Sequence, residues 1–163
     1  MRGCLQGKIR SAGIIDKLKL SILDFQNKEM IGDTWSPTAS MSNLNYVLAD
    51  AFNHKAIVYQ LDFIGAFLKA NVKHIVFVKL DSRYGEYLPE YINYFGIPLR
   101  LKKSMYGMTN SGKLFSDELA NWLIDEAVFK QSHFQMSIYY KYAPDGSKLV
   151  VLSYVDDCLL VYI

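Results

Sequence analysis

The last apolar run of the chain decides its fold, and it reads Leu149 Val150 Val151 Leu152 Ser153 Tyr154 Val155 Asp156 Asp157 Cys158 Leu159 Leu160 Val161 Tyr162 Ile163. Two adjacent acids, Asp156 and Asp157, interrupt this run. Burying an ionised carboxylate is costly unless a cation or a hydrogen-bond donor compensates for the lost water. We therefore predict two buried strands joined by a bend that carries both acids, with a metal ion as the expected compensation.

The same run does not have the properties of a membrane span. It is shorter than the roughly 20 apolar residues that a spanning helix needs, and two carboxylates in its middle would be costly in hydrocarbon. The N-terminal residues Arg2, Lys8, Arg10 and Asp16 are charged and surround no sustained apolar core. We therefore expect neither a signal peptide nor a membrane anchor.

The composition is that of a globular protein. The chain has 163 residues, of which 51% are hydrophobic and 21% charged, and its length predicts one domain with a real core. A net charge of +2 permits nucleic-acid binding without arguing for it. The two cysteines, Cys4 and Cys158, have the spacing of neither a disulfide framework nor a metal site, which favours a reducing compartment.

Hydrophobic periodicity and turn residues predict the elements between the termini. In chain order they are a strand over 17–25, a loop over 32–37, a helix over 41–52 capped by Ser40 or Ser42, strands over 56–62, 75–80 and 99–103, a helix over 114–127, and a hairpin of 138–142 with 148–154. Residues 1–15 show no clear period. Strands with two intervening helices predict an α+β fold, a mostly antiparallel sheet with helices packed on one face.

Three features have two interpretations each. Lys17 and Lys19 share one face of their strand and either face water or contact phosphates. The aromatic residues of 84–95 either pack a long loop onto the domain, which we favour, or form a base-stacking surface. Asp62, which ends an apolar strand, is either a turn former or a site residue, and the second interpretation needs a second acidic position beside it.

The strand that ends at Asp62 and the bend at Asp156 and Asp157 can be neighbours in such a sheet. Carboxylates from two strands are the oxygen ligands that Mg²⁺ prefers, together with water and substrate phosphate. Two such ions suit phosphoryl transfer, which relies on positioning and electrostatics.

Four motifs in order make the chain similar to one known family. They are Thr34 Trp35 Ser36 Pro37, then Gln60 Leu61 Asp62 Phe63 Ile64 Gly65 Ala66 Phe67 Leu68, then Lys103 Ser104 Met105 Tyr106 Gly107 Met108, then Tyr154 Val155 Asp156 Asp157. Together they resemble the copia-type reverse transcriptases of long-terminal-repeat retrotransposons, from about Lys17 onward. The resemblance implies an RNA-directed DNA polymerase domain with the fingers and palm of a right-hand polymerase. Residues 1–55 and about 70–100 would be fingers, and 56–69 and 101–163 palm.

The resemblance also implies residue roles. Asp62, Asp156 and Asp157 would be the catalytic, metal-binding aspartates for two Mg²⁺ ions, with Mn²⁺ as a substitute. Phe67 would be the aromatic gate that excludes a 2′-hydroxyl and so selects deoxynucleotides.

The nucleotide pocket and the partners follow from the same resemblance. Lys17 and Lys19 would meet the triphosphate, and Tyr106 with Gly107 would line the templating side. The implied partners are an RNA or DNA template with its primer, deoxynucleoside triphosphates, and the integrase and ribonuclease H parts of a retrotransposon polyprotein. The implied location is intracellular, in the cytoplasm or a virus-like particle, without a membrane.

Some residues depart from the family pattern. Residues 109–113 read Thr-Asn-Ser-Gly-Lys where the family has Lys-Gln-Ala-Pro-Arg, and Gly112 in place of proline predicts a looser loop. Lys19 replaces an arginine and loses bidentate phosphate geometry. We expect the chain to lack the thumb and to be weak or inactive alone as an enzyme. The alternative is an inactive retrotransposon remnant or a domesticated RNA-binding module.

Overall fold

The computed structural model describes residues 2–9, 15–23, 33–82, 85 and 88–163. The chain divides into two compact units, which are described separately below. The first comprises Met1–Thr34 and Phe67–Leu114, and the second Trp35–Ala66 and Phe115–Ile163. No helix in the described part of the chain is long and apolar enough to cross a membrane.

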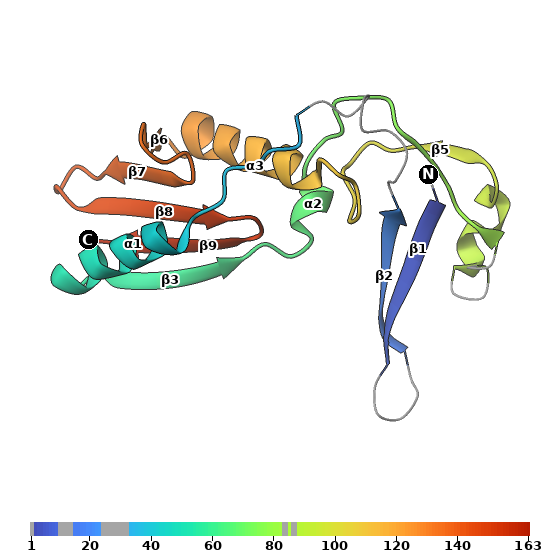
Figure 1. Cartoon of the computed structure of the whole chain (residues 1–163), viewed down its shortest axis with the longest axis horizontal. Coiled ribbons are helices and arrows are strands. Elements are labelled where there is room, and N and C mark those ends of the chain that lie inside the picture. Colours follow the sequence, from blue (N-terminus) through green and yellow to red (C-terminus); the bar gives the residue numbers. More distant parts are fainter. Residues whose placement is uncertain (1, 10–14, 24–32, 83–84, 86–87) are drawn as a thin grey trace. The chain divides into compact units, whose positions relative to one another are not determined.

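The second unit is built on a five-stranded antiparallel sheet with the order β3-β9-β8-β7-β6 (Figure 1). The strands are β3 Ile57–Asp62, β6 Lys130–Gln131, β7 Ile138–Tyr142, β8 Lys148–Tyr154 and β9 Asp157–Tyr162. The last apolar run therefore forms the predicted pair of strands, and β9 pairs with β3 on its other side. The predicted neighbourhood of β3 and the acidic bend is confirmed.

Helix α1, Met41–Asn53, covers one face of this sheet. The Ser40 side chain accepts a hydrogen bond from the Asn43 backbone N–H at 3.2 Å, so the first of the two predicted caps is the one used. Its buried residues Val47 and Ala51 pack in a cluster with β8 and β9 residues, namely Val150, Leu152 and Val161. The predicted helix is confirmed, but its apolar face is confirmed only in part, because Met41, Leu48 and Phe52, which share its three- and four-residue period, are exposed.

Helix α3, Ser111–Asn121, continues into a π-helical turn, η3, Trp122–Glu126. The three- and four-residue spacing of Leu119, Trp122 and Leu123 in the sequence predicts that they share an apolar face. Leu119 and Leu123 are buried, but Trp122 is 56% exposed, so the prediction is wrong for Trp122. A π turn holds more residues than an α turn and rotates the side chains that follow. Gly112 lies in the first turn of α3, so the looser loop predicted there is also wrong.

Helical segments contact both faces of the five-stranded sheet rather than one. Ile138 and Tyr140 in β7 pack toward the α1 cluster. Side chains alternate along a strand, so Lys141 points to the opposite face. There its ammonium donates to the Ala127 carbonyl at 3.1 Å and lies 4.7 Å from the Phe129 ring centroid, which places the segment after η3 on that face. The predicted packing of helices on one face is therefore wrong.

The first unit contains a second, four-stranded sheet with the order β2-β1-β4-β5, which the sequence did not predict as a separate sheet. Its strands are β1 Arg2–Ile9, β2 Ile15–Leu23, β4 Phe77–Lys79 and β5 Pro98–Arg100. All pairs are antiparallel except β1 with β4. A small core of Val78 and Met108 stabilises this unit.

The aromatic stretch of this unit is only partly packed. It contains a short 3-10 helix, η2 Pro89–Tyr94, in which Tyr91 is 45% and Tyr94 49% exposed. Tyr84 and Tyr87 lie outside the described residues. Tyr91 and Tyr94 are therefore exposed, contrary to the favoured packing interpretation, whereas Phe95 is half-buried.

Candidate active site

A two-residue turn presents the acidic pair. Tyr154 ends β8 directly opposite Asp157, which begins β9, so Val155 and Asp156 form the turn between them. The backbone N–H of Phe63 donates to the Asp156 carbonyl at 3.0 Å. The turn is therefore fixed to the residue that follows Asp62.

The structure brings the three predicted catalytic acids to one end of the sheet. Asp62 is directly opposite Asp157 in the register of β3 and β9, and Asp156 precedes Asp157 in the turn. Opposite residues of an antiparallel pair have Cβ atoms about 4.5 to 5.5 Å apart, and like charges there repel each other. Asp62 and Asp157 are exposed and Asp156 is half-buried. A cation bound between them would relieve this repulsion.

Gln60 contacts one of the three acids, although its place in the sequence motif predicted no role for it. Its side-chain amide donates to the Asp157 carboxylate at 3.5 Å, a long hydrogen bond. Gln60 precedes Asp62 by two residues, so the two side chains share a face of β3. The alternation of side chains along a strand was therefore the sequence pattern from which the position of Gln60 beside the acids could have been predicted.

The donor chemistry of the three acids fits Mg²⁺, which binds carboxylate oxygens. Within residues 2–9, 15–23, 33–82, 85 and 88–163, however, no three His, Cys, Asp or Glu side chains lie close enough together to hold an ion. The fold therefore gathers suitable ligands at one place, and an ion would have to draw their side chains together.

Val155 holds the turn in a strained conformation. Its φ is 52°, in the left-handed region that β-branched residues rarely adopt. A positive φ at the first central residue is typical of the tight turns that join twisted hairpin strands. Strain of this kind is often found at functional sites, where the surrounding structure enforces it.

Replacing Val155 by glycine is expected to stabilise the second unit by about 1 kcal/mol, because glycine adopts positive φ without the side-chain clash. Urea unfolding followed by tryptophan fluorescence measures this change, since both tryptophans, Trp35 and Trp122, belong to the second unit. Val128, with φ 58° and 72% exposure, gives the control Val128→Gly at a position away from the acids. A loss of stability in Val155→Gly alone would show that the valine side chain contributes packing that outweighs its strain.

Cys158 follows the acids and is buried, with 3% of its surface exposed. Burial, and secondarily the charge of Asp157, raises the pKa of its thiol from 9.0 to about 11. The unfolded chain therefore loses this proton at a lower pH than the folded chain.

The stability that this thiol contributes is present below pH 9 and is lost as pH rises toward 11. We expect the loss to be on the order of 2 kcal/mol. The free energy of unfolding of Cys158→Ala should therefore fall less than that of the unchanged chain between pH 8 and pH 11, measured by urea titration at each pH. Parallel pH curves for the two proteins would contradict the raised pKa.

The first unit brings two predicted nucleotide-pocket residues into contact. The rings of Phe67 and Tyr106 meet edge to face, with centroids 5.1 Å apart and planes at 62°. Gly107 follows Tyr106 with φ 88°, a conformation that favours glycine. Phe67 lies in helix α2, Ala66–Lys69.

Backbone contacts join the chain segments that carry these two rings. The Lys103 ammonium donates to the Lys69 carbonyl at 2.7 Å, and the Ser104 N–H donates to the Ala70 carbonyl at 2.9 Å. Ser104 is fully buried. The Lys-Ser-Met-Tyr-Gly-Met motif therefore positions Tyr106 against Phe67.

The remaining predicted residues lie in the first unit. Lys17 and Lys19 belong to β2, opposite Lys8 and Gln6 of β1. The structure thus places Lys17, Lys19, Phe67, Tyr106 and Gly107 in one unit and the three aspartates in the other. In the second unit, His133 is exposed in the connector before β7, as expected for a lone histidine with no second ligand residue near it in the sequence.

Comparison with known proteins agrees with the motifs. Residues 20–162 match the family model described as reverse transcriptase (RNA-dependent DNA polymerase). The retrovirus-related Pol polyprotein from transposon TNT 1-94 of Nicotiana tabacum is 22% identical over 147 residues, which are 89% of this chain and 11% of that polyprotein. No solved structure matches the chain significantly. The chain therefore belongs to the reverse transcriptase (RNA-dependent DNA polymerase) family, among its copia-type retrotransposon members.

Proposed function

We propose that this chain is the part of a retrotransposon polymerase that joins deoxynucleotides to a primer on an RNA or DNA template. The observation that carries the proposal is the register that sets Asp62 opposite Asp157, with Asp156 in the adjoining turn. Family membership supports the same activity. The chain spans about a ninth of the Pol polyprotein that it matches, so template, primer, and integrase and ribonuclease H partners belong to the proposal as well.

Asp62, Asp156 and Asp157 would hold Mg²⁺, in two ions or with Mn²⁺ as a substitute. When bound, the metal supplies Lewis-acid activation of the primer hydroxyl and charge neutralisation at the phosphates. The protein contributes the position of the carboxylates. Pairing of β3 with β9 sets Asp62 against Asp157, and the bond from Phe63 to the Asp156 carbonyl fixes the turn. Gln60 orients one Asp157 oxygen.

The first unit would bind the incoming nucleotide. Phe67 would lie under its sugar, where the ring leaves no room for a 2′-hydroxyl, and its contact with Tyr106 would keep the ring in place. Tyr106 and Gly107 would line the templating side, and Lys17 and Lys19 would contact the triphosphate. In this proposal the β1–β2 sheet belongs to the fingers and the β3–β9–β8 sheet to the palm.

Replacing Phe67 by alanine is expected to relax sugar selection. The ratio of deoxynucleotide to ribonucleotide incorporation should fall by at least about tenfold, because discrimination by a clash disappears with the clashing group. The measurement is single-nucleotide addition to a primer on an RNA template, with each sugar in turn and Mg²⁺ or Mn²⁺. Phe52→Ala is a matched control, since Phe52 is 85% exposed and lies on α1. Unchanged selectivity in Phe67→Ala would contradict the gate. If the unchanged chain added not even one nucleotide, that result would contradict the proposed activity and favour the inactive remnant instead.

A further inference from the structure

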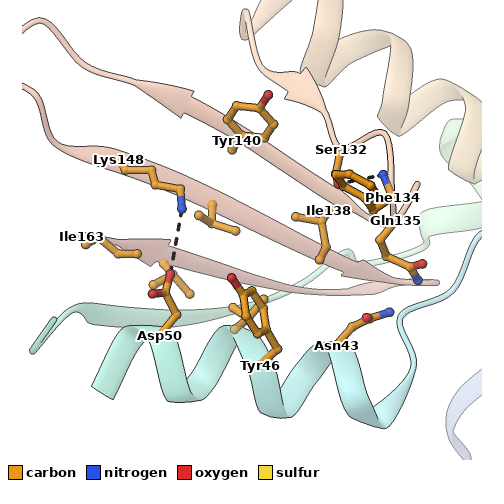
Figure 2. A pocket seen from close by; sticks show the side chains of 13 residues that line it. Asn43, Tyr46, Asp50, Ser132, Phe134, Gln135, Ile138, Tyr140, Lys148 and Ile163 are labelled. Carbon is orange, nitrogen blue, oxygen red and sulfur yellow. Dashed lines mark hydrogen bonds and ion pairs between the residues drawn. The ribbon is translucent and has the colours of Figure 1, made fainter. Parts of the chain in front are cut away.

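A cavity of about 340 Å³ lies in the second unit between α1 and the strands β7, β8 and β9 (Figure 2). Its volume is within the usual range for small-molecule sites, about 300 to 1,000 Å³. Val47, Ile138 and Val150 contribute its apolar lining. Neither the three predicted catalytic aspartates nor the predicted nucleotide-pocket residues line it, so it requires its own explanation.

Aromatic rings on two sides of this cavity are exposed. Tyr46 rises from α1 and is 70% exposed, and Phe134 comes from the connector before β7 and is 99% exposed (Figure 2). Tyr140 of β7 adds a third, half-buried ring. Exposed rings facing a cavity are costly in water and provide flat surfaces on which a planar group can stack.

Polar groups lie at both ends of the cavity. The amides of Asn43 and Gln135 line the end near the start of α1, and the ammonium of Lys148 lies at the other end. Asn43 and Asp50 are separated by two turns of α1, which is about 10 Å along the helix axis. The cavity therefore offers amides, then aromatic faces, and then a cation that lies beside the carboxylate of Asp50.

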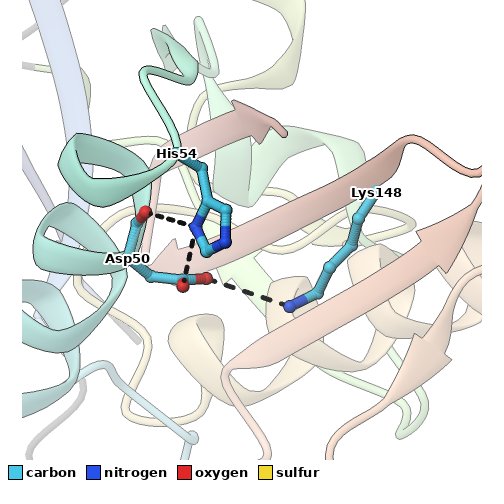
Figure 3. Close-up of polar contacts among 3 residues, drawn as sticks. All are labelled: Asp50, His54 and Lys148. Atoms are coloured by element: carbon cyan, nitrogen blue, oxygen red, sulfur yellow. Dashed lines mark hydrogen bonds and ion pairs between the residues drawn. The ribbon is translucent and has the colours of Figure 1, made fainter.

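The Lys148 ammonium is only loosely paired and can still bind an anion. The Nδ1 of His54, the C-cap residue of α1, lies 2.9 Å from the Asp50 backbone carbonyl and 3.2 Å from one Asp50 carboxylate oxygen, whereas the Lys148 ammonium is 3.9 Å from the other carboxylate oxygen (Figure 3). A hydrogen-bonded ammonium and carboxylate are about 2.7 to 2.9 Å apart, so the contact of Lys148 with Asp50 is loose. A phosphate can compete for this ammonium.

We propose that this cavity binds one unpaired nucleotide of a single-stranded nucleic acid. The base stacks among Tyr46, Phe134 and Tyr140, its polar edge faces the amides of Asn43 and Gln135, and its phosphate pairs with Lys148. The proposal rests on the proposed function only in the question of where the single-stranded nucleic acid comes from. An apolar peptide would use the aromatic rings but would make no use of the Asn43 amide or of the loosely paired Lys148 ammonium.

The test uses the 163-residue chain and a labelled twelve-nucleotide oligouridylate that carries 4-thiouridine, with the matching oligothymidylate as a second probe. Binding is measured by fluorescence anisotropy, and the cross-linked residues are mapped by mass spectrometry. Phe134→Ala should raise the Kd about tenfold, and the control Phe52→Ala should leave it unchanged within about twofold. Lys148→Gln should reduce the slope of log affinity against log salt concentration by about the amount expected for one phosphate contact. Cross-links should fall on 43–50 and 132–140, and a preference between the probes identifies the strand as RNA or DNA.

Equal Kd values for Phe134→Ala and Phe52→Ala, with cross-links confined to other residues, would overturn this proposal. A concentration-dependent dimer that only Phe134→Ala disrupts would also overturn it, because the cavity would then bind protein. Neither the anisotropy measurement nor the cross-link map depends on primer extension. A chain that binds in this cavity but adds no nucleotide would contradict only the proposed polymerase activity, and a chain that adds nucleotides without binding here would contradict only the cavity.

Discussion

Single-nucleotide addition in Mg²⁺ should fall at least about 100-fold in Asp156→Asn, because the amide keeps the size of the side chain but removes the negative charge that would bind the metal. Asp62→Asn should have an effect of the same order, since Asp62 meets the same acids from β3. The measurement is the rate of one deoxynucleotide addition to a labelled primer on an RNA template at saturating enzyme.

The chain offers a matched control in Asp145→Asn. Asp145 lies in the turn between β7 and β8, where one carboxylate oxygen accepts from the Ser147 N–H at 3.0 Å and from its hydroxyl at 2.6 Å. Asparagine keeps an accepting oxygen, so folding and addition should be unchanged. Full activity in Asp156→Asn, or an equal loss in Asp145→Asn, would contradict the assigned role of the turn.

Replacing Leu152 by alanine is expected to reduce the free energy of unfolding of the second unit by about 2 to 5 kcal/mol. Leu152 is 3% exposed and packs under α1 in the cluster with Val47 and Val161. Its truncation removes apolar contacts and leaves a cavity that the paired strands on both sides of β8 cannot close. Urea unfolding followed by tryptophan fluorescence reports this unit.

Ile64→Ala is the control for this change. Ile64 is 88% exposed in the segment after Asp62, so the same kind of truncation should alter stability by less than about 0.5 kcal/mol. If Leu152→Ala unfolded at the same urea concentration as Ile64→Ala, the packing of α1 against β8 and β9 would be wrong.

Local sequence patterns predicted most elements of the second unit correctly. The period of α1 and its Ser40 cap, the hairpin of β7 and β8, and the strands on both sides of Asp156 each depend on neighbouring residues. The sequence could not predict that Trp122 would be exposed, because a π turn changes the period inside the helix. It also could not predict helical segments on both faces, because the nearly continuous burial of β8 does not say which element covers each face.

The sequence by itself determined the family, the three acids and the strands that carry them, since motifs and hydrophobic periods are properties of residues close together in the chain. Only the tertiary structure decided that Asp62 stands opposite Asp157, that Gln60 reaches the same carboxylate, and that Phe67 meets Tyr106. Pairing register and ring contacts join residues that are 39 to 97 positions apart, and no local pattern encodes them. The acidic turn could therefore be recognised from its sequence motif, whereas the residues that contact it are determined by the pairing of the strands.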